Sequence, residues 1–284
     1  MAGVEGRVVV VTGAGGGLGR QHALLLASQG AKVAVNDVGD ADAGPSGSMA
    51  EQVAGEIHDA GGGALANHDD VATSQGGRAL IEQTLSRWGR VDGVVNNAGI
   101  LRDVTLHKMT DEQWDAVLKV HAYGTFHVTR AAWPHLRAQQ FGRVVVTSST
   151  SGLYGNVGQA NYATAKMGVL GLMAALAREG ARHQITANAI VPLATTRMTA
   201  PLFDAETAER LDPAYVSPAV VHLVSEDCTD SGMAILAAGG SYRRVALFES
   251  PGASFEHVPT PAEVAARWDS ITDLTGAAPG IAPL

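Results

Sequence analysis

Tyr162 and Lys166 are the residues whose types and spacing most directly suggest chemistry. Because they are four residues apart, they share one face of a helix. A free tyrosine has a pKa of about 10 and is a poor base at neutral pH. A nearby ammonium group favours the phenolate, which can then accept the proton of an alcohol. Taken alone, the pair also fits two surface residues of a helix, so its interpretation depends on the rest of the chain.

A glycine-rich segment, Thr12-Gly-Ala-Gly-Gly-Gly-Leu-Gly19, follows four valines and precedes a helical pattern. Glycine allows the backbone to approach a phosphate closely, and the N-terminus of a helix favours an anion. The segment lacks the Lys-Ser/Thr ending of a nucleoside-triphosphate loop. We therefore predict a dinucleotide site whose pyrophosphate contacts Thr12, Gly13, Gly17, Leu18 and Gly19.

Asp37 ends the second β-branched run, 18 residues after Gly19. An acid at this distance accepts hydrogen bonds from the adenosine ribose of NAD and repels the 2′-phosphate of NADP. Val38 stands where an NADP enzyme would place an arginine, and the glycine-rich segment contains no basic residue. NAD is therefore the predicted cofactor. The alternative is that Asp37 is an ordinary turn acid at a strand end.

Short apolar runs alternate with helical patterns along the chain, which predicts an α/β fold with a doubly wound parallel sheet. The predicted strands are residues 8–11, 32–36, 93–96, 143–148 and 186–191. The predicted helices are residues 20–29, 49–60, 73–88, 110–139 and 160–183. The alternation ends near residue 244, and five prolines follow. We expect one cofactor-binding domain over residues 1–244 and a C-terminal extension, residues 245–284, packed on its core.

Composition excludes several classes of protein. The net charge of −8 over 284 residues argues against a general nucleic-acid binder, since phosphates need a basic field. One cysteine, Cys228, excludes an internal disulfide and a cysteine-rich zinc site. The histidines are scattered, so we predict no metal site. The chain shows no signal-peptide pattern and no apolar run long enough to cross a bilayer, which predicts a cytoplasmic protein.

Four motifs resemble, in order and spacing, those of the short-chain dehydrogenase/reductase family. They are the glycine-rich segment, Asp70-Val71, Asn96-Asn-Ala-Gly99, and Ser149 followed by Tyr162-x-x-x-Lys166. The resemblance implies a single Rossmann-type domain of about seven strands in the order 3-2-1-4-5-6-7, with helices on both faces. It also implies a homodimer or homotetramer.

The resemblance assigns roles to individual residues. Ser149 would hydrogen-bond the substrate oxygen, Tyr162 would transfer the proton, and Lys166 would hold the nicotinamide ribose. Ser151 is an alternative to Ser149, because residues 147–151 are all hydroxyl-bearing. The remaining residues that would bind the cofactor are Asp70, Val71, Asn97, Ala98 and Gly99.

Two positions depart from the family pattern. His121 stands where the family usually has an asparagine that holds a water beside the lysine. We expect His121 to join the proton relay and to shape the acid limb of the pH–rate profile; the alternative is a structural histidine. The second departure is Pro192-Leu193, where the family commonly has Pro-Gly. Pro192 and Thr196 are expected to contact the cofactor there.

Longer stretches, residues 36–39, 96–103 and 152–162, are similar to the dehydrogenase units of type 2 peroxisomal multifunctional enzymes. This likeness implies NAD-dependent oxidation of a 3-hydroxyacyl-CoA in fatty-acid or steroid side-chain β-oxidation. The alternatives are a dehydrogenase of 17β-hydroxysteroids or other small secondary alcohols, and a non-catalytic protein that senses NAD.

Two groups of residues are expected to meet the substrate. A lid at about residues 193–215 would present the apolar side chains of Met198, Leu202 and Phe203. The cations Arg102, Lys108 and Arg197 flank the expected substrate loops and are candidates for coenzyme A phosphates. The alternatives are ordinary lid packing and solvated surface charges.

Overall fold

The computed structural model describes residues 3–39, 49–196, 199 and 204–280. The chain divides into two compact units, Met1–Arg244 and Val245–Leu284. The first unit contains every predicted catalytic and cofactor-binding residue. The two units are described separately.

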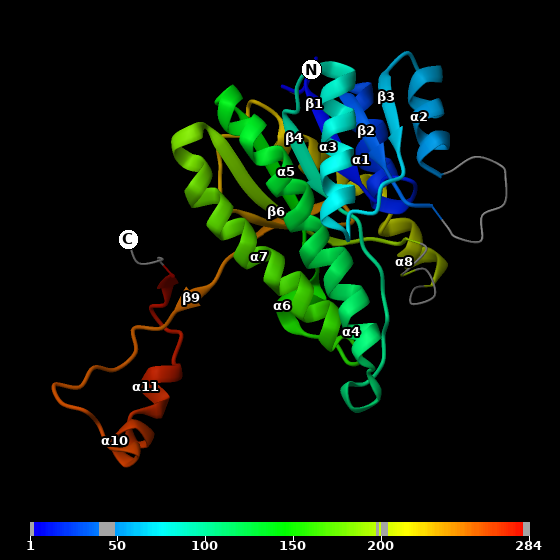
Figure 1. Cartoon of the computed structure of the whole chain (residues 1–284). Coiled ribbons are helices and arrows are strands. Elements are labelled where there is room, and N and C mark those ends of the chain that lie inside the picture. The colour runs from blue at the N-terminus through cyan, green and yellow to red at the C-terminus, as the bar shows by residue number, and fades with distance from the viewer. Residues whose placement is uncertain (1–2, 40–48, 197–198, 200–203, 281–284) are drawn as a thin grey trace. The chain divides into compact units, whose positions relative to one another are not determined.

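The first unit is built on an eight-stranded sheet in the order β3-β2-β1-β4-β5-β6-β7-β8 (Figure 1). Strands β1 to β7 pair in parallel with their neighbours. The strand bounds are β1 (Val8–Thr12), β2 (Lys32–Asn36), β3 (Gly63–Asn67), β4 (Gly93–Asn96), β5 (Gly142–Thr147), β6 (Ile185–Leu193), β7 (Ala234–Ala238) and β8 (Ser241–Val245). The predicted α/β fold and the order of its first seven strands are confirmed.

The eighth strand was not predicted. Gly239 and Gly240, both at positive φ, connect β7 to β8, and a connection of two residues joins only antiparallel strands. Strand β8 has the sequence Ser-Tyr-Arg-Arg-Val and is largely exposed, so it shows no buried apolar run. The predicted strand ranges also omitted β3 and β7, whose alanine-rich sequences contain only one of the β-branched residues typical of strands, Ile235 in β7.

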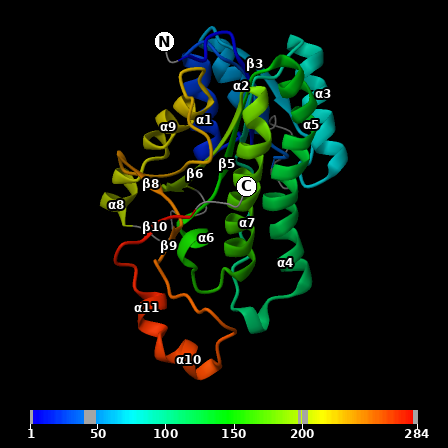
Figure 2. The same cartoon turned by 90° about the vertical axis from the view of Figure 1, so that its left-hand side faces the viewer.

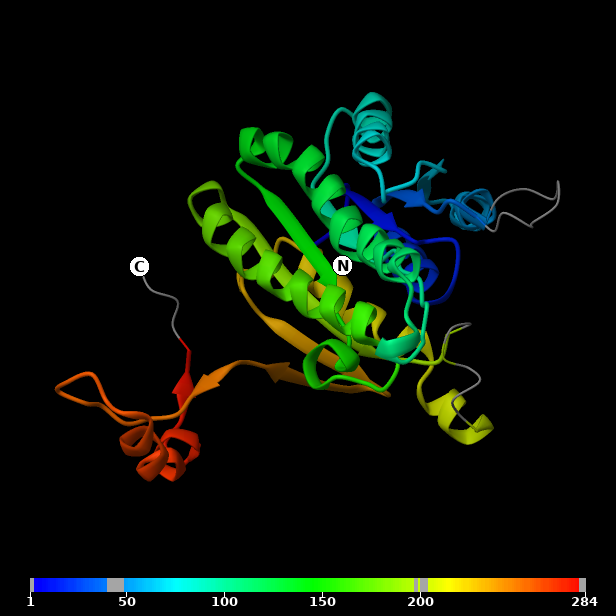
Figure 3. The ribbon, with the colours of Figure 1, turned by 60° about the horizontal axis from the view of Figure 1, so that its bottom comes forward.

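Helices cover both faces of the sheet. On one face lie α3 (Ser74–Trp88), α5 (Gly124–Gln139) and α7 (Ala160–Gly180), with α5 and α7 side by side (Figure 3). On the other face lie α1 (Gly17–Ser28), α2 (Met49–Asp59) and α9 (Ser217–Val224) (Figure 2). Shorter helices are α4 (Asp111–Leu118), α6 (Thr150–Tyr154) and α8 (Ala205–Arg210).

The helix predicted over residues 110–139 is not continuous. A π-helical turn, η2 (Lys119–Tyr123), separates α4 from α5. The apolar spacing continues across this turn, so periodicity alone did not reveal it. Single π-helical turns inside helices occur often at functional sites, and His121 lies in this one.

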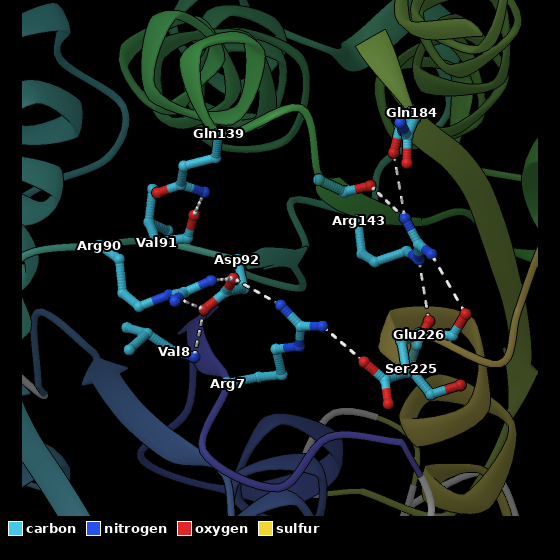
Figure 4. A network of polar contacts seen from close by, with 11 residues as sticks. Arg7, Val8, Arg90, Val91, Asp92, Gln139, Arg143, Gln184, Ser225 and Glu226 are labelled. Atoms are coloured by element: carbon cyan, nitrogen blue, oxygen red, sulfur yellow. Dashed lines mark hydrogen bonds and ion pairs between the residues drawn. The ribbon is translucent and has the colours of Figure 1, made fainter.

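A polar network connects segments at the amino-terminal ends of the strands (Figure 4). The buried guanidinium of Arg143 donates to the carbonyl oxygens of Gly142, Gln184, Ser225 and Glu226 at 2.8–3.4 Å. These acceptors come from β5, from the residue before β6 and from the segment after α9. One side chain therefore joins three parts of the chain that are distant in sequence.

We expect Arg143→Met to lower the free energy of unfolding by about 3 kcal/mol, because the buried carbonyl groups would lose their donor. Urea denaturation followed by circular dichroism measures the change. Arg87 is an exposed arginine near the end of α3, and Arg87→Met should change stability by less than about 0.5 kcal/mol. Equal effects of the two substitutions would show that the network contributes nothing.

The second unit has little secondary structure. It contains the antiparallel pair β9 (Phe248–Glu249) and β10 (Ala278–Pro279), and the helices α10 (Pro261–Ala266) and α11 (Trp268–Thr272). Thr260 and Glu263 form a reciprocal cap at the start of α10. The expectation that this extension packs on the core stays a prediction. In the part of the chain that the structure describes, no helix has both the length and the apolar character needed to cross a membrane.

Candidate active site

The predicted site residues gather where the parallel strands end. The glycine-rich segment follows β1, Asp37 follows β2, Asn97 follows β4 and Ser149 follows β5. Strands β1 and β4 are neighbours in the sheet, and the chain runs outward in opposite directions from this pair. Such a reversal at the carboxyl ends of strands is where open α/β sheets bind ligands.

The backbone of the glycine-rich segment depends on glycine at several positions. Gly13 and Gly17 have φ values of 63° and 50°, which favour glycine. A Cβ at Gly19 would lie 2.1 Å from the carbonyl oxygen of Gly13, so a side chain would push the loop away from α1. No side chain caps the first turn of α1. These features fit a pyrophosphate at the helix N-terminus.

Thr12 and Asn97 connect this segment to the end of β4. The hydroxyl of Thr12 accepts the N–H groups of Asn97 and Ala98, each at 3.0 Å. The side-chain amide of Asn97 donates to the carbonyl oxygens of Thr12 and Gly13, each at 3.1 Å. The geometry therefore places Asn97 as a support of the loop, while its contact with a cofactor stays a prediction.

Asp37 lies against the glycine-rich segment. Its carboxylate accepts the N–H groups of Gly15 and Gly39, each at 2.9 Å. A Cβ at Gly15 would lie 2.9 Å from the same carboxylate, so only glycine allows this approach. The acid is thus held beside the loop, where a ribose next to the pyrophosphate would lie.

The other predicted cofactor residues lie around the same edge of the sheet. Asp70 accepts the N–H of Ala72 at 2.9 Å, and the next residue, Val71, is buried against Gly124. The side chain of Thr196 lies near Gly17, since a Cβ added to Gly17 would be 3.5 Å from it. Pro192 lies in β6, opposite Ala237 of β7.

Ser149, Tyr162 and Lys166 come together between α6 and α7. The side chain of Ser149 lies close enough to the phenol of Tyr162 to lower its pKa. The hydroxyl of Ser149 also accepts the N–H of Ser151 at the start of α6. The ammonium group of Lys166 donates to the carbonyl oxygen of Thr147 at 2.6 Å and lies 5.6 Å from the centre of the Tyr162 ring.

Burial controls the electrostatics of this cluster. Burial raises the pKa of Tyr162, the Ser149 side chain opposes the rise, and the carboxylate of Asp103 adds to it. Burial also lowers the pKa of Lys166 to about 7. Desolvation therefore disfavours the charged form of both groups, and the expectation that Lys166 favours the phenolate stays a prediction.

His121 is buried beside Tyr162, with the two rings in a T-shaped contact 5.1 Å apart. Its Nε2 atom lies 2.8 Å from the carbonyl oxygen and 3.1 Å from the amide nitrogen of Ile100. Burial and the charge of Lys166 lower the pKa of His121 well below its ordinary value, against the opposing hydrogen bond to Ile100. The ring is therefore neutral near pH 7, and the role of His121 in the proton relay and in the acid limb of the pH–rate profile stays a prediction.

We expect Gly99→Ala to lower both stability and kcat, because a Cβ at Gly99 would lie 2.3 Å from the Cε1 atom of His121. Overpacking of this kind costs about 1–3 kcal/mol. Denaturation and steady-state assays measure the two effects. The double variant Gly99→Ala/His121→Ala removes the ring and should recover most of the stability lost. No recovery would mean that the clash with His121 is not the cause.

Sequence reasoning missed three residues around Tyr162. Asn161 is fully buried and donates to the carbonyl oxygens of Arg102 and Gln113. Gln159 donates to the carboxylate of Asp103 at 2.7 Å. The signal was present, because two amide side chains lie within the three residues before the tyrosine, but nothing local showed that they reach the loop after β4.

The expected substrate residues are only partly placed. Arg197, Met198, Leu202 and Phe203 lie outside the described residues. Arg102 and Lys108 are exposed, and Arg102 donates to the carbonyl oxygen of Leu101 at 2.7 Å. Within the described ranges, no three His, Cys, Asp or Glu side chains gather closely enough to hold a metal ion.

Comparison with known proteins identifies the family of the chain. A profile described as short chain dehydrogenase matches residues 7–207. A solved structure titled as a short chain dehydrogenase from Mycobacterium avium superimposes with a TM-score of 0.87 at 39% identity, over 98% of both chains.

Three curated relatives extend this likeness. A putative short-chain type dehydrogenase/reductase of Mycobacterium tuberculosis is 55% identical and aligns over 98% of both chains. The peroxisomal multifunctional enzyme type 2 of Mus musculus is 44% identical over 96% of this chain, which spans 37% of that enzyme. The hydroxyacyl-CoA dehydrogenase ChsB1 of Mycobacterium tuberculosis is 43% identical over 78% of this chain and 71% of its own length.

Proposed function

Because the chain belongs to the short-chain dehydrogenase family and is an oxidoreductase acting on CH–OH groups, we propose that it converts a 3-hydroxyacyl-CoA to the 3-oxoacyl-CoA with NAD. The gathering of Ser149, Tyr162 and Lys166 at the start of α6 and in α7, with the Lys166 ammonium 5.6 Å from the Tyr162 ring, is the observation that carries the reaction type. The name of one relative, hydroxyacyl-CoA dehydrogenase, supports the substrate class.

The residues of the site divide the chemistry among them. NAD, when bound, supplies the hydride acceptor. Ser149 donates a hydrogen bond to the alcohol oxygen and holds it near Tyr162, which accepts the proton. Since burial raises the pKa of Tyr162, its phenolate requires a positive charge close by. Protonated Lys166, 5.6 Å from the centre of the Tyr162 ring, supplies that charge, and in alcohol formation Tyr162 returns the proton.

The choice of NAD rests on Asp37. We expect Asp37→Ala combined with Val38→Arg to raise the ratio of kcat/KM for NADP over NAD by at least about tenfold, because a repelling acid is replaced by a cation. Val38 is 59% exposed, so an arginine fits there. Assays with both cofactors measure the ratio, and Asp59→Ala, at the end of α2, is the control. An unchanged ratio would remove Asp37 as the selector.

A substrate panel tests the proposed function. The purified protein is mixed with NAD and either enantiomer of a 3-hydroxyacyl-CoA, or with steroid and small secondary alcohols, and NADH absorbance is followed. Turnover of an acyl-CoA supports the proposal. Turnover of steroids alone would instead identify a 17β-hydroxysteroid type of dehydrogenase. Binding of NAD without turnover of any alcohol would identify the non-catalytic sensing protein.

Assembly and location are further parts of this proposal. Large apolar side chains of η2, α5 and α7 are exposed, namely Tyr123, Phe126 and Met167, which supports the predicted homodimer or homotetramer. Light scattering coupled to gel filtration measures the assembly. We keep the sequence-based prediction of a cytoplasmic protein, although one relative carries the word peroxisomal in its name.

A further inference from the structure

Two segments distant in sequence are joined just before Tyr162. Residues 102–104, in the loop after β4, bind residues 158–161, which lead into α7. The N–H of Val104 donates to Gly158 at 2.8 Å, and the side chain of Gln159 donates to Asp103 at 2.7 Å. The side chain of Asn161 donates to the carbonyl oxygen of Arg102 at 3.2 Å. We call these two segments the α7 clamp.

Asn161 is the buried centre of the clamp. Its side-chain nitrogen also donates to the carbonyl oxygen of Gln113 in α4, at 3.1 Å, and its side-chain oxygen accepts the N–H of Tyr162 at 2.8 Å. One fully buried side chain therefore joins the loop after β4, helix α4 and the first turn of α7. Asn161 therefore fixes the position of the Tyr162 backbone relative to the loop and to α4.

Gln159 holds Asp103 in place. Its side chain is 8% exposed, and its oxygen accepts a hydrogen bond from Asn156 at 3.3 Å, which sets the direction of its nitrogen. That nitrogen donates to one carboxylate oxygen of Asp103, a residue otherwise exposed to solvent. The negative charge of Asp103 is thus kept close enough to Tyr162 to act on its phenol.

We propose that Gln159 and Asn161 are positioning residues for Tyr162, and that the Asp103 carboxylate, which the hydrogen bond from Gln159 fixes at the start of α7, opposes loss of the Tyr162 proton. The proposal rests on the proposed dehydrogenase function of the site. It adds a charge outside the Ser149, Tyr162 and Lys166 cluster that contributes to the proton transfer.

Other charged or titratable groups also face Tyr162 or lie on the elements around it. Lys166 is on its own helix, and His121 approaches from η2. Helix α4, which packs on α7, and helix α6 carry exposed groups: Asp111, Glu112, Asp115 and Tyr154. Asp111 therefore offers a matched control, since it is an exposed acid on a neighbouring element.

The first test compares Asp103→Asn with Asp111→Asn in the full chain saturated with NAD. Tyrosine labelled with carbon-13 at Cζ reports ionisation by NMR, and Tyr162→Phe assigns the signal. We expect Asp103→Asn to lower the midpoint pH of the Tyr162 ionisation by roughly half a pH unit, because a negative charge no longer opposes the phenolate. Asp111→Asn should leave it unchanged. If Tyr162 ionised at the same midpoint pH in Asp103→Asn as in the wild type, the proposal would be overturned.

This titration needs no substrate, so it gives an answer even if the chain fails to oxidise any hydroxyacyl-CoA. Failure of the proposed function and failure of this inference are therefore distinguishable. If a substrate is found, the rising limb of kcat/KM for alcohol oxidation should move to lower pH by the same amount in Asp103→Asn. A limb that stays in place would count against the role of Asp103.

The second test addresses position. Gln159→Ala should lower kcat by about tenfold, since a small displacement of a reacting group is costly, while KM for NAD stays unchanged. Gln159→Glu reverses the interaction with Asp103 and should be at least as harmful. Asn161→Ser retains a smaller polar group in case Asn161→Ala does not fold. Wild-type kcat in folded Gln159→Ala and Asn161→Ser would overturn the positioning role.

Discussion

Replacing Tyr162 by phenylalanine is expected to lower kcat/KM for alcohol oxidation by about 10³-fold, within the range that general base catalysis contributes. The substitution removes only the phenolic oxygen, which is the proposed proton acceptor. The ring contact with His121 is retained, so the fold should be unaffected. Steady-state assays and thermal unfolding measure the two properties.

Tyr154→Phe is the matched control for this prediction. Tyr154 ends the short helix α6, only eight residues before Tyr162, and its side chain is 73% exposed. Its substitution should change kcat/KM by less than about twofold. If both variants kept wild-type activity, Tyr162 could not be the proton acceptor. If Tyr162→Phe also lost stability, its low activity would not identify a chemical role.

Acidification is expected to destabilise the protein strongly through His22. This residue of α1 is fully buried, and its Nδ1 atom lies 2.8 Å from the hydroxyl of Ser217 in α9. Its Nε2 atom has no hydrogen-bond partner among the described residues. Burial lowers the pKa of His22 from 6.5 to about 3, because the charged ring would lose its hydration.

The sign of the pH effect follows from proton uptake on unfolding. Between pH 6.5 and about 3 the unfolded chain binds a proton at this histidine and the folded chain does not. Stability is therefore fully present above pH 6.5 and falls as pH decreases through this window, by at most roughly 4–5 kcal/mol. Buried His121, whose pKa is also lowered, acts in the same direction.

Denaturant unfolding at a series of pH values measures this loss. His22→Gln replaces the titrating ring by a neutral polar side chain, so the slope of stability against pH should decrease below pH 6.5. His135→Gln, on the exposed surface of α5, should leave the slope unchanged. An identical slope in wild type and His22→Gln would show that buried His22 does not control acid stability.

Much of the fold and part of the site were predictable because their signals are local. Valine-rich runs specify β1 and β5, and the glycine at position 13 allows the positive φ that the loop adopts there. The exposed strand β8 and the alanine-rich strands β3 and β7 carry weaker signals. The partners of Arg143 were not predictable, since they lie up to 83 residues away and are backbone carbonyls that any residue type provides.

The sequence by itself determined the α/β class, the glycine-rich turn after β1 and the placement of Tyr162 and Lys166 on one helix, because helical spacing and glycine geometry act over a few residues. Only the tertiary structure decided the charges at the site. Burial lowers the pKa of Lys166 to about 7 and raises that of Tyr162, and the α7 clamp brings Asp103 close to the phenol. Desolvation and long-range contacts depend on what surrounds each group, and no local pattern contains that information.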